Sequence, residues 1–167
     1  MSSLRALIRD DRGSPAAETV LVLPILFALI FGPLEVGNYF LSEHKVVKAV
    51  RDGARFAARR SFDDYPACTP TAQVITDTRN VTRTGIIADG GTPRLGTWTD
   101  PASIDVAVVS CDAAGTYTGI YVNPAAPGVP VVRVSATVPY QLVLGDLGLT
   151  NKTLTLRAHS EATVTGI

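Results

Sequence analysis

The sequence predicts an α+β fold in which a long N-terminal helix, apolar in its first half, is followed by a small antiparallel β-sheet domain packed on helix. An uncharged apolar run over residues 19–34 predicts the helix, and apolar and polar side chains alternate in several stretches of residues 104–164. The chain has 167 residues and zero net charge, which suits one small domain behind the helix. We therefore expect a leader over 1–13, a transmembrane and stem helix over 14–60, and an α+β domain over 61–167.

The first half of the expected helix is a candidate membrane span. Residues 19–42 carry one charge, Glu35. As an α-helix they would extend about 36 Å at about 1.5 Å per residue, which is enough to cross a bilayer. Pro24 and Pro33 lie inside this stretch, and membrane helices tolerate proline better than soluble helices do. We expect Glu35 near the second interface, either in contact with water or paired with a basic residue of another subunit.

An acidic residue precedes the apolar run, and the residues before it do not form a secretory signal peptide. Gly13 and Ser14 lie upstream of Glu18, so a cut between Gly13 and Ser14 would leave the apolar run on the mature chain. Ser14 would then carry a free α-amine, and one helical turn would bring that amine beside the Glu18 carboxylate. The alternatives for Glu18 are the amine of a neighbouring subunit, or the lipid headgroups, where it would complement the helix N-terminus.

The helix is expected to continue beyond the membrane, because residues 43–60 contain no proline. A narrow apolar stripe recurs at helical spacing, formed by Val47, Val50, Ala54 and Ala57. A basic stripe occupies another face, formed by Lys48, Arg51, Arg55 and Arg59. We interpret the basic stripe as a solvated face, with contact to anionic headgroups or acidic neighbours as the alternative. We expect this helix to contribute little to the core of the sheet domain.

The domain after the helix shows one helical pattern and four extended ones. Gly90, Gly91, Pro93 and Gly96 mark a loop, and a second loop is expected over residues 124–130. Residues 140–149 are expected to form a short helix or a loop. We predict a helix over 71–88 and strands over 104–111, 116–122, 132–138 and 154–164, forming a sheet with one polar face.

Cys68 and Cys111, the only two cysteines, both follow the helix. They suit an oxidising compartment, where a bridge between them would stabilise the domain by about 4 kcal/mol in the chain-entropy model. The alternative is a pair of buried free thiols. The lysines and arginines that flank the span favour the opposite orientation, with the domain in the cytoplasm. We give more weight to the cysteines and to the expected cut.

Three groups of residues carry a family resemblance. They are Gly13 with Glu18 and the apolar run that follows, the segment Phe31-Gly32-Pro33-Leu34-Glu35-Val36-Gly37, and the segment Ala49-Val50-Arg51-Asp52-Gly53-Ala54-Arg55-Phe56-Ala57-Ala58. Over residues 5–60 the chain resembles the TadE-like pseudopilins. Members of that family typically have a leader that ends in glycine, an acidic residue five positions later, an FG-x-x-E-x-G segment and an A-x-R-E-G-A-R segment.

The resemblance implies a minor pseudopilin of a tight-adherence (Flp-type) pilus or a type II/IV-like secretion system, acting in pilus assembly and adhesion. It implies a prepilin-like leader that a prepilin peptidase removes between Gly13 and Ser14, and an assembly or register carboxylate at Glu18. The implied partners are other pilins and pseudopilins, the inner-membrane assembly platform and the lipid bilayer. The implied location is the bacterial inner membrane as a single-pass protein, with the domain periplasmic or, in a pilus, extracellular.

The sequence shows no catalytic constellation. His44 and His159 have no cysteine or carboxylate at metal-ligand spacing, and no glycine-rich phosphate loop is present. Zero net charge gives no bulk attraction to nucleic acid. We therefore expect no enzymatic activity, cofactor, metal or nucleic-acid partner. The alternative function is a permanently membrane-anchored, single-pass envelope binding protein that is neither processed nor polymerised.

Overall fold

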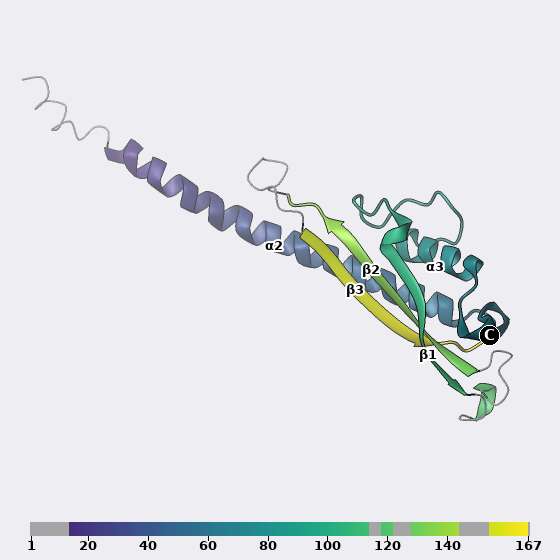
Figure 1. Cartoon of the computed structure of the whole chain (residues 1–167). Coiled ribbons are helices and arrows are strands. Elements are labelled where there is room, and N and C mark those ends of the chain that lie inside the picture. The colour runs from purple at the N-terminus through teal and green to yellow at the C-terminus, as the bar shows by residue number, and fades with distance from the viewer. Residues whose placement is uncertain (1–13, 114–117, 122–127, 144–153, 167) are drawn as a thin grey trace, which may run out of the picture. The chain divides into compact units, whose positions relative to one another are not determined.

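The computed structural model describes residues 14–113, 118–121, 128–143 and 154–166, and the side chains from residue 17 onward. Figure 1 shows the elements α2 (Ser14–Ala58), α3 (Ala72–Thr84), β1 (Ile104–Ala113), β2 (Gly128–Tyr140) and β3 (Leu154–Thr163). The chain divides into an N-terminal unit that ends at Asn38 and a C-terminal unit, Tyr39–Ile167. The helix α2 begins in the first unit and ends in the second.

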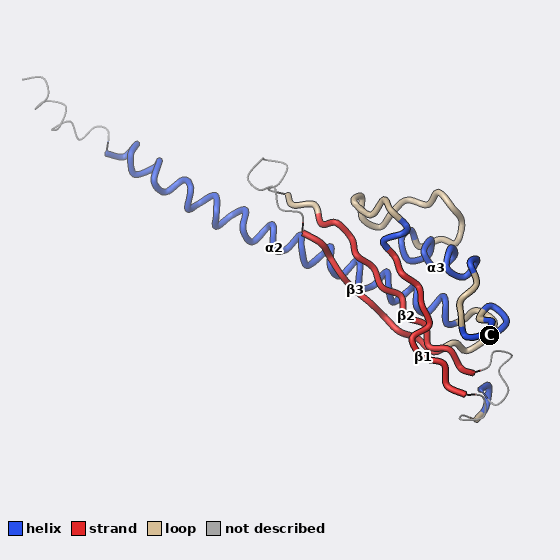
Figure 2. The backbone as a smooth tube through the Cα atoms, viewed as in Figure 1, coloured by secondary structure: helices blue, strands red, loops and turns tan. Residues whose placement is uncertain are grey.

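The three strands form an antiparallel sheet in the order β1-β2-β3 (Figure 2). Alternate residues of β2 are buried, as the period of a strand with one covered face requires. The opposite face carries exposed polar side chains, including Arg133, whose guanidinium pairs with Glu161 on β3 at 2.6 Å. The predicted α+β fold, with a long apolar helix and a small antiparallel sheet packed on helix, is confirmed.

The second half of α2 forms part of the hydrophobic core, so the expectation that this helix contributes little is wrong. Val46 and Val50 are fully buried in a cluster with Val134 and Leu156 of the sheet. The smaller residues Ala49, Ala54 and Ala57 are buried in the same cluster. Their short side chains bring the helix backbone close to its neighbours, so a stripe that looks weakly hydrophobic in sequence still packs tightly.

The C-terminal end of α2 is capped by Tyr65, which follows the helix closely, and by Thr165, which is far away in the sequence. The Tyr65 hydroxyl donates to the Ala57 carbonyl at 2.7 Å, and the Thr165 amide donates to the Ala58 carbonyl at 2.8 Å. These bonds satisfy carbonyl groups that have no partner within the helix. Burial raises the pKa of the Tyr65 phenol, and the Asp64 carboxylate raises it further, so the hydroxyl keeps the proton that it donates.

The helix α3 confirms the helix predicted over 71–88 and is shorter at its C-terminal end. The Thr71 hydroxyl caps its N-terminus by accepting from the Val74 amide, and Gly85 ends it in the left-handed region at φ 86°. Polar side chains are buried on its inner face, namely those of Asp77, Thr78, Asn80 and Thr82.

The predicted strand over 116–122 is wrong where the structure describes it, because Gly119–Tyr121 form a 3-10 turn. The strand β2 begins at Gly128 and takes in Pro130, for which a loop was predicted. Proline fits here because Pro130 pairs with Cys111 of β1 and has no partner in the ladder with β3. The region predicted as a helix or loop over 140–149 lies mostly outside the described residues.

Candidate functional site

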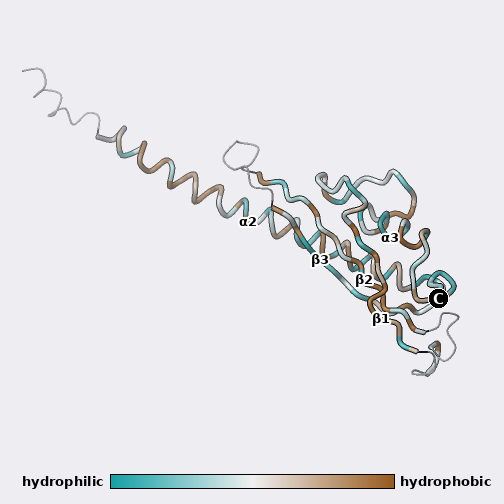
Figure 3. The backbone as a smooth tube through the Cα atoms, viewed as in Figure 1, coloured by the Kyte–Doolittle hydropathy of each residue, from teal (hydrophilic) through white to brown (hydrophobic). Residues whose placement is uncertain are grey.

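The apolar side chains of the N-terminal unit face outward. Val20, Leu21, Leu29 and Leu34 are all exposed, and Figure 3 shows a continuous hydrophobic stretch along this part of α2. Within the described residues, Ala17–Ala58 is the one helix long and apolar enough to cross a membrane, by length and composition. An apolar surface of this extent marks a site of protein or membrane contact. The helix therefore suggests membrane anchoring.

Ser14, where the sequence places a new N-terminus, and Glu18 both lie in α2. The backbone of Ser14 is helical, so Glu18 follows it by one turn, and the Glu18 carboxylate is exposed. Gly13 lies outside the described residues. Glu35 is partly exposed and lies about 25 Å farther along the helix at about 1.5 Å per residue, so the structure does not bring the two carboxylates together.

Gly53 lies where α2 packs closely against Thr82 of α3. A β-carbon on Gly53 would collide with the side chain of Thr82, and it would lie 3.6 Å from Val134 on the sheet. The adjacent Asp52 forms an ion pair with Arg94 at 2.9 Å, which ties the loop after α3 to the helix. Sequence reasoning missed both roles, although a glycine in a helix interior, which lowers helix propensity, is a signal for close packing.

The basic stripe on α2 is exposed at Lys48, Arg51, Arg55 and Arg59. Within the described part of the chain, ion pairs of this region are formed instead by Asp52 with Arg94 and by Arg60, whose guanidinium lies 3.2 Å from the Asp64 carboxylate. This arrangement fits the interpretation of the stripe as a solvated face.

Cys68 and Cys111 form a disulfide, as the sequence predicts, with a Cα–Cα distance of 6.1 Å. The bridge joins the segment after α2 to the end of β1. Ala67 and Cys68 both adopt left-handed backbone conformations, with φ of 51° and 58°. Such conformations are unfavourable for residues other than glycine, so surrounding contacts must hold this turn.

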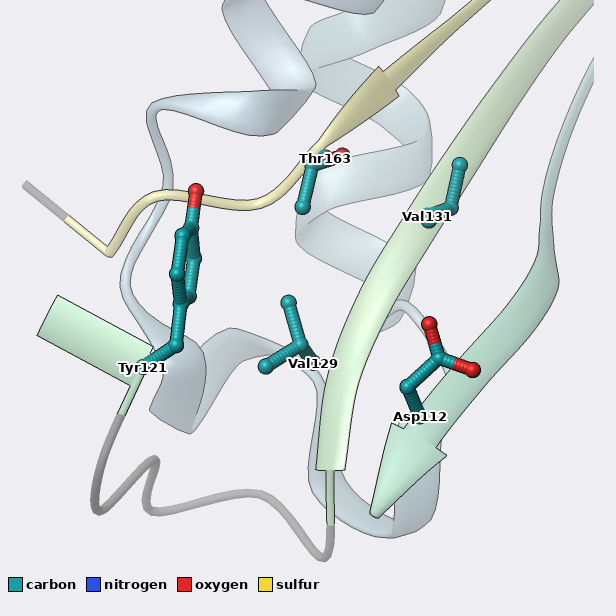
Figure 4. Close-up of a pocket in the computed structure, with 5 residues that line it drawn as sticks. All are labelled: Asp112, Tyr121, Val129, Val131 and Thr163. Carbon is teal, nitrogen blue, oxygen red and sulfur yellow. The ribbon is translucent and has the colours of Figure 1, made fainter. Parts of the chain in front are cut away.

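A small pocket with a volume of about 200 Å³ lies where β1 ends and β2 begins. Figure 4 shows Tyr121 and Asp112 on either side of Val129, with Val131 and Thr163 above. His44 and His159 are exposed and lie in other parts of the fold. Among the described residues, no group of three or more His, Cys, Asp or Glu side chains is placed to hold a metal ion.

Residues 13–55 match the model of a family described as TadE-like protein. The match confirms the resemblance seen in the sequence over these residues, and it covers Glu18, Glu35 and Gly53. Residues 56–167, which include α3 and the sheet, lie outside it. No curated protein and no solved structure is significantly similar to the chain.

Proposed function

We propose, from the premise that residues 13–55 are TadE-like, that this protein is a minor pilin-like subunit of a tight-adherence (Flp-type) pilus or a related type II/IV-like secretion system. One observation carries the proposal. The family match covers residues 13–55, and within them α2 exposes the apolar side chains of the uncharged run that follows Glu18. The role is structural, in pilus assembly and adhesion.

In this proposal the chain is a precursor in the bacterial inner membrane. A prepilin peptidase removes residues 1–13 on the cytoplasmic side, between Gly13 and Ser14. The mature helix then holds the subunit in the bilayer as a single-pass protein. The C-terminal unit is periplasmic, or extracellular once the subunit has joined a pilus, and the disulfide supports this because such bridges persist in oxidising compartments.

Glu18 is the residue that we assign to assembly. Glu18 lies at the edge of the apolar run, where a carboxylate that enters lipid unpaired costs on the order of a few kcal/mol. The amine that processing creates on Ser14, from the same chain or from a neighbouring subunit, would neutralise that charge. A pair between subunits would also fix their axial register. The partners are therefore other pilins or pseudopilins, brought together at the inner-membrane assembly platform.

Glu18→Gln should reduce co-purification of the other pilus subunits with this protein and should lower piliation at equal expression. The substitution keeps the size of the side chain and removes its charge, and cleavage after Gly13 should continue because the glycine is retained. Glu43→Gln makes the same chemical change outside the apolar run and serves as the matched control, with recovery expected to stay normal. Pull-down of the tagged full chain from membranes, with quantified partner subunits, is the measurement.

If Glu18→Gln and Glu43→Gln recover partners equally well, Glu18 is an interfacial carboxylate without a role in assembly. The protein would then be better described as a permanently anchored, single-pass envelope binding protein that is not polymerised.

A further inference from the structure

The C-terminal unit exposes apolar side chains at the end where α2 enters it. Phe40 is 54% exposed and Leu41 is 65% exposed on the helix. Val143, which follows β2, is 49% exposed, and Leu154, at the start of β3, is 42% exposed. We call these four residues the apolar rim. The rim belongs wholly to the C-terminal unit.

Contacts inside the unit link α2, next to Phe40, to the strand ends near Leu154. The ring of Tyr39 meets the ring of Tyr140 edge-on, with 5.2 Å between ring centroids, and Tyr140 pairs with Leu154 in the sheet register. Figure 1 shows this end of β2 and the start of β3 beside α2. Leu142 packs against the hydrophobic core immediately before Val143.

A separate hydrogen bond holds this end of β2 in place. The Thr97 hydroxyl donates to the Pro139 carbonyl at 2.7 Å, and it does so from a loop anchored by the buried Trp98. The end of β2 next to the rim is therefore tied to the loop that holds Trp98.

We propose that the apolar rim contacts the lipid bilayer, so that the C-terminal unit rests on the membrane surface. The proposal rests on the membrane anchoring proposed above. Phe40 and Leu41 are themselves the last apolar residues of the candidate span over 19–42. Exposed apolar side chains next to the end of a membrane helix can be removed from water without a protein partner. The interfacial region of the same bilayer can bury them.

The chemistry of neighbouring residues fits the lipid interface. Tyr39, Phe40 and Tyr140 place aromatic rings where membrane proteins concentrate them, at the level of the headgroups. Lys45 and Lys48 follow on α2 and are exposed, at a position where they can meet anionic lipid phosphates. No charged residue occurs in the segments 39–42 and 140–143.

Quenching of tryptophan fluorescence by brominated lipid tests the contact on the full chain in phosphatidylcholine–phosphatidylglycerol vesicles. Val143→Trp places a probe on the rim. Val109→Trp is the matched control, because Val109 is similarly exposed, at 41%, and lies on β1 away from the rim. Trp98 is the only native tryptophan and is buried, so the unsubstituted chain supplies a constant background.

With lipids brominated in the upper acyl chain, the emission added by Val143→Trp should be largely quenched and shifted to the blue. The emission added by Val109→Trp should remain unquenched. Leu154→Trp gives a second probe of the rim and should behave like Val143→Trp. If both rim probes are quenched no more than Val109→Trp, the proposal is overturned. A blue shift without quenching by the lipid would instead identify a protein neighbour, such as a second copy, and would also overturn it.

A tryptophan at a third position distinguishes a failure of the rim contact from a failure of membrane anchoring. Phe27→Trp lies in the apolar run and should be quenched by lipids brominated deep in the acyl chain. If Phe27→Trp is quenched and the rim probes are not, the helix spans the bilayer and only the rim contact fails. If Phe27→Trp is also unquenched, the membrane anchoring on which both proposals rest fails.

Discussion

Replacing both Cys68 and Cys111 with serine should lower the free energy of unfolding of the C-terminal unit by about 4 kcal/mol in the chain-entropy model. The two cysteines are 43 residues apart, so the bridge removes a large part of the freedom of the unfolded chain. Denaturant unfolding of the full chain in micelles, followed by the fluorescence of Trp98, measures the change. Trp98 is a suitable probe because it is the only tryptophan and is buried in the core.

The unsubstituted chain after reduction should unfold at the same denaturant concentration as the double serine variant, which makes it the matched control. Loss of the bridge should change the backbone most at Ala67 and Cys68, because the bridge helps to hold their left-handed conformations. Equal unfolding midpoints for the oxidised chain and the double variant would contradict a stabilising bridge. In unpermeabilised cells, labelling of both thiols by an impermeant maleimide without prior reduction would disprove the bridge but support the periplasmic location. Labelling by a membrane-permeant maleimide alone would place the C-terminal unit in the cytoplasm and contradict that location.

Gly53→Ala should destabilise the C-terminal unit by about 1–3 kcal/mol, although alanine is the better helix former. The added methyl group would collide with Thr82, whose hydroxyl already donates to the Thr78 carbonyl at 2.7 Å inside α3. Either the two helices must separate or that buried hydrogen bond must break. Thermal or denaturant unfolding of the full chain, again followed by Trp98, is the measurement.

Gly37→Ala is the control for this substitution, because no atom outside the local helix lies within 4 Å of the position that its β-carbon would take. It should leave the unfolding of the C-terminal unit unchanged. A Thr82→Ala background should recover part of the stability that Gly53→Ala loses, because it removes the colliding hydroxyl. Equal stability of Gly53→Ala and the unsubstituted chain would show that α2 and α3 do not meet as closely as described.

The parts of the fold with a clear local pattern could be predicted. The helix α2 follows from an uncharged apolar run and from a continuation without proline, and it ends at Ala58, close to the predicted residue 60. The strands follow from alternation, which is clear in β2 from Val132 to Val138 because one face is covered and the other is not.

The packing of the core was harder to predict, because it depends on small and polar side chains. In the sequence, Gly53 only lowers the helix propensity of its segment. The position of Thr82 shows that a larger side chain would collide there. The inner face of α3 buries Asp77 and Asn80, and each has partners that sequence patterns do not reveal. The Asp77 carboxylate accepts from Gln73 at 2.7 Å, and the Asn80 amide donates to the Asp89 carboxylate at 2.8 Å. A search for apolar periodicity cannot find such contacts.

The candidate site could be predicted to a different degree at each residue. The pairing of Cys68 with Cys111 follows from there being only two cysteines. Ser14 and Glu18 lie one helical turn apart in α2, as the helix predicted over 14–60 requires. The roles of Gly13 and Glu18 depend on a peptidase and on neighbouring subunits, which a single chain does not contain, and they remain proposals.

The intact mass of the mature protein, extracted from the membranes of the native host, tests the central claim most directly. A precursor of the pilin type should yield a chain that begins at Ser14, and Gly13→Val should leave the chain uncut because a bulky residue replaces the glycine before the cleavage site. A mature chain that begins at Met1 or Ser2, or anywhere beyond residue 34, would contradict the pilin-like account.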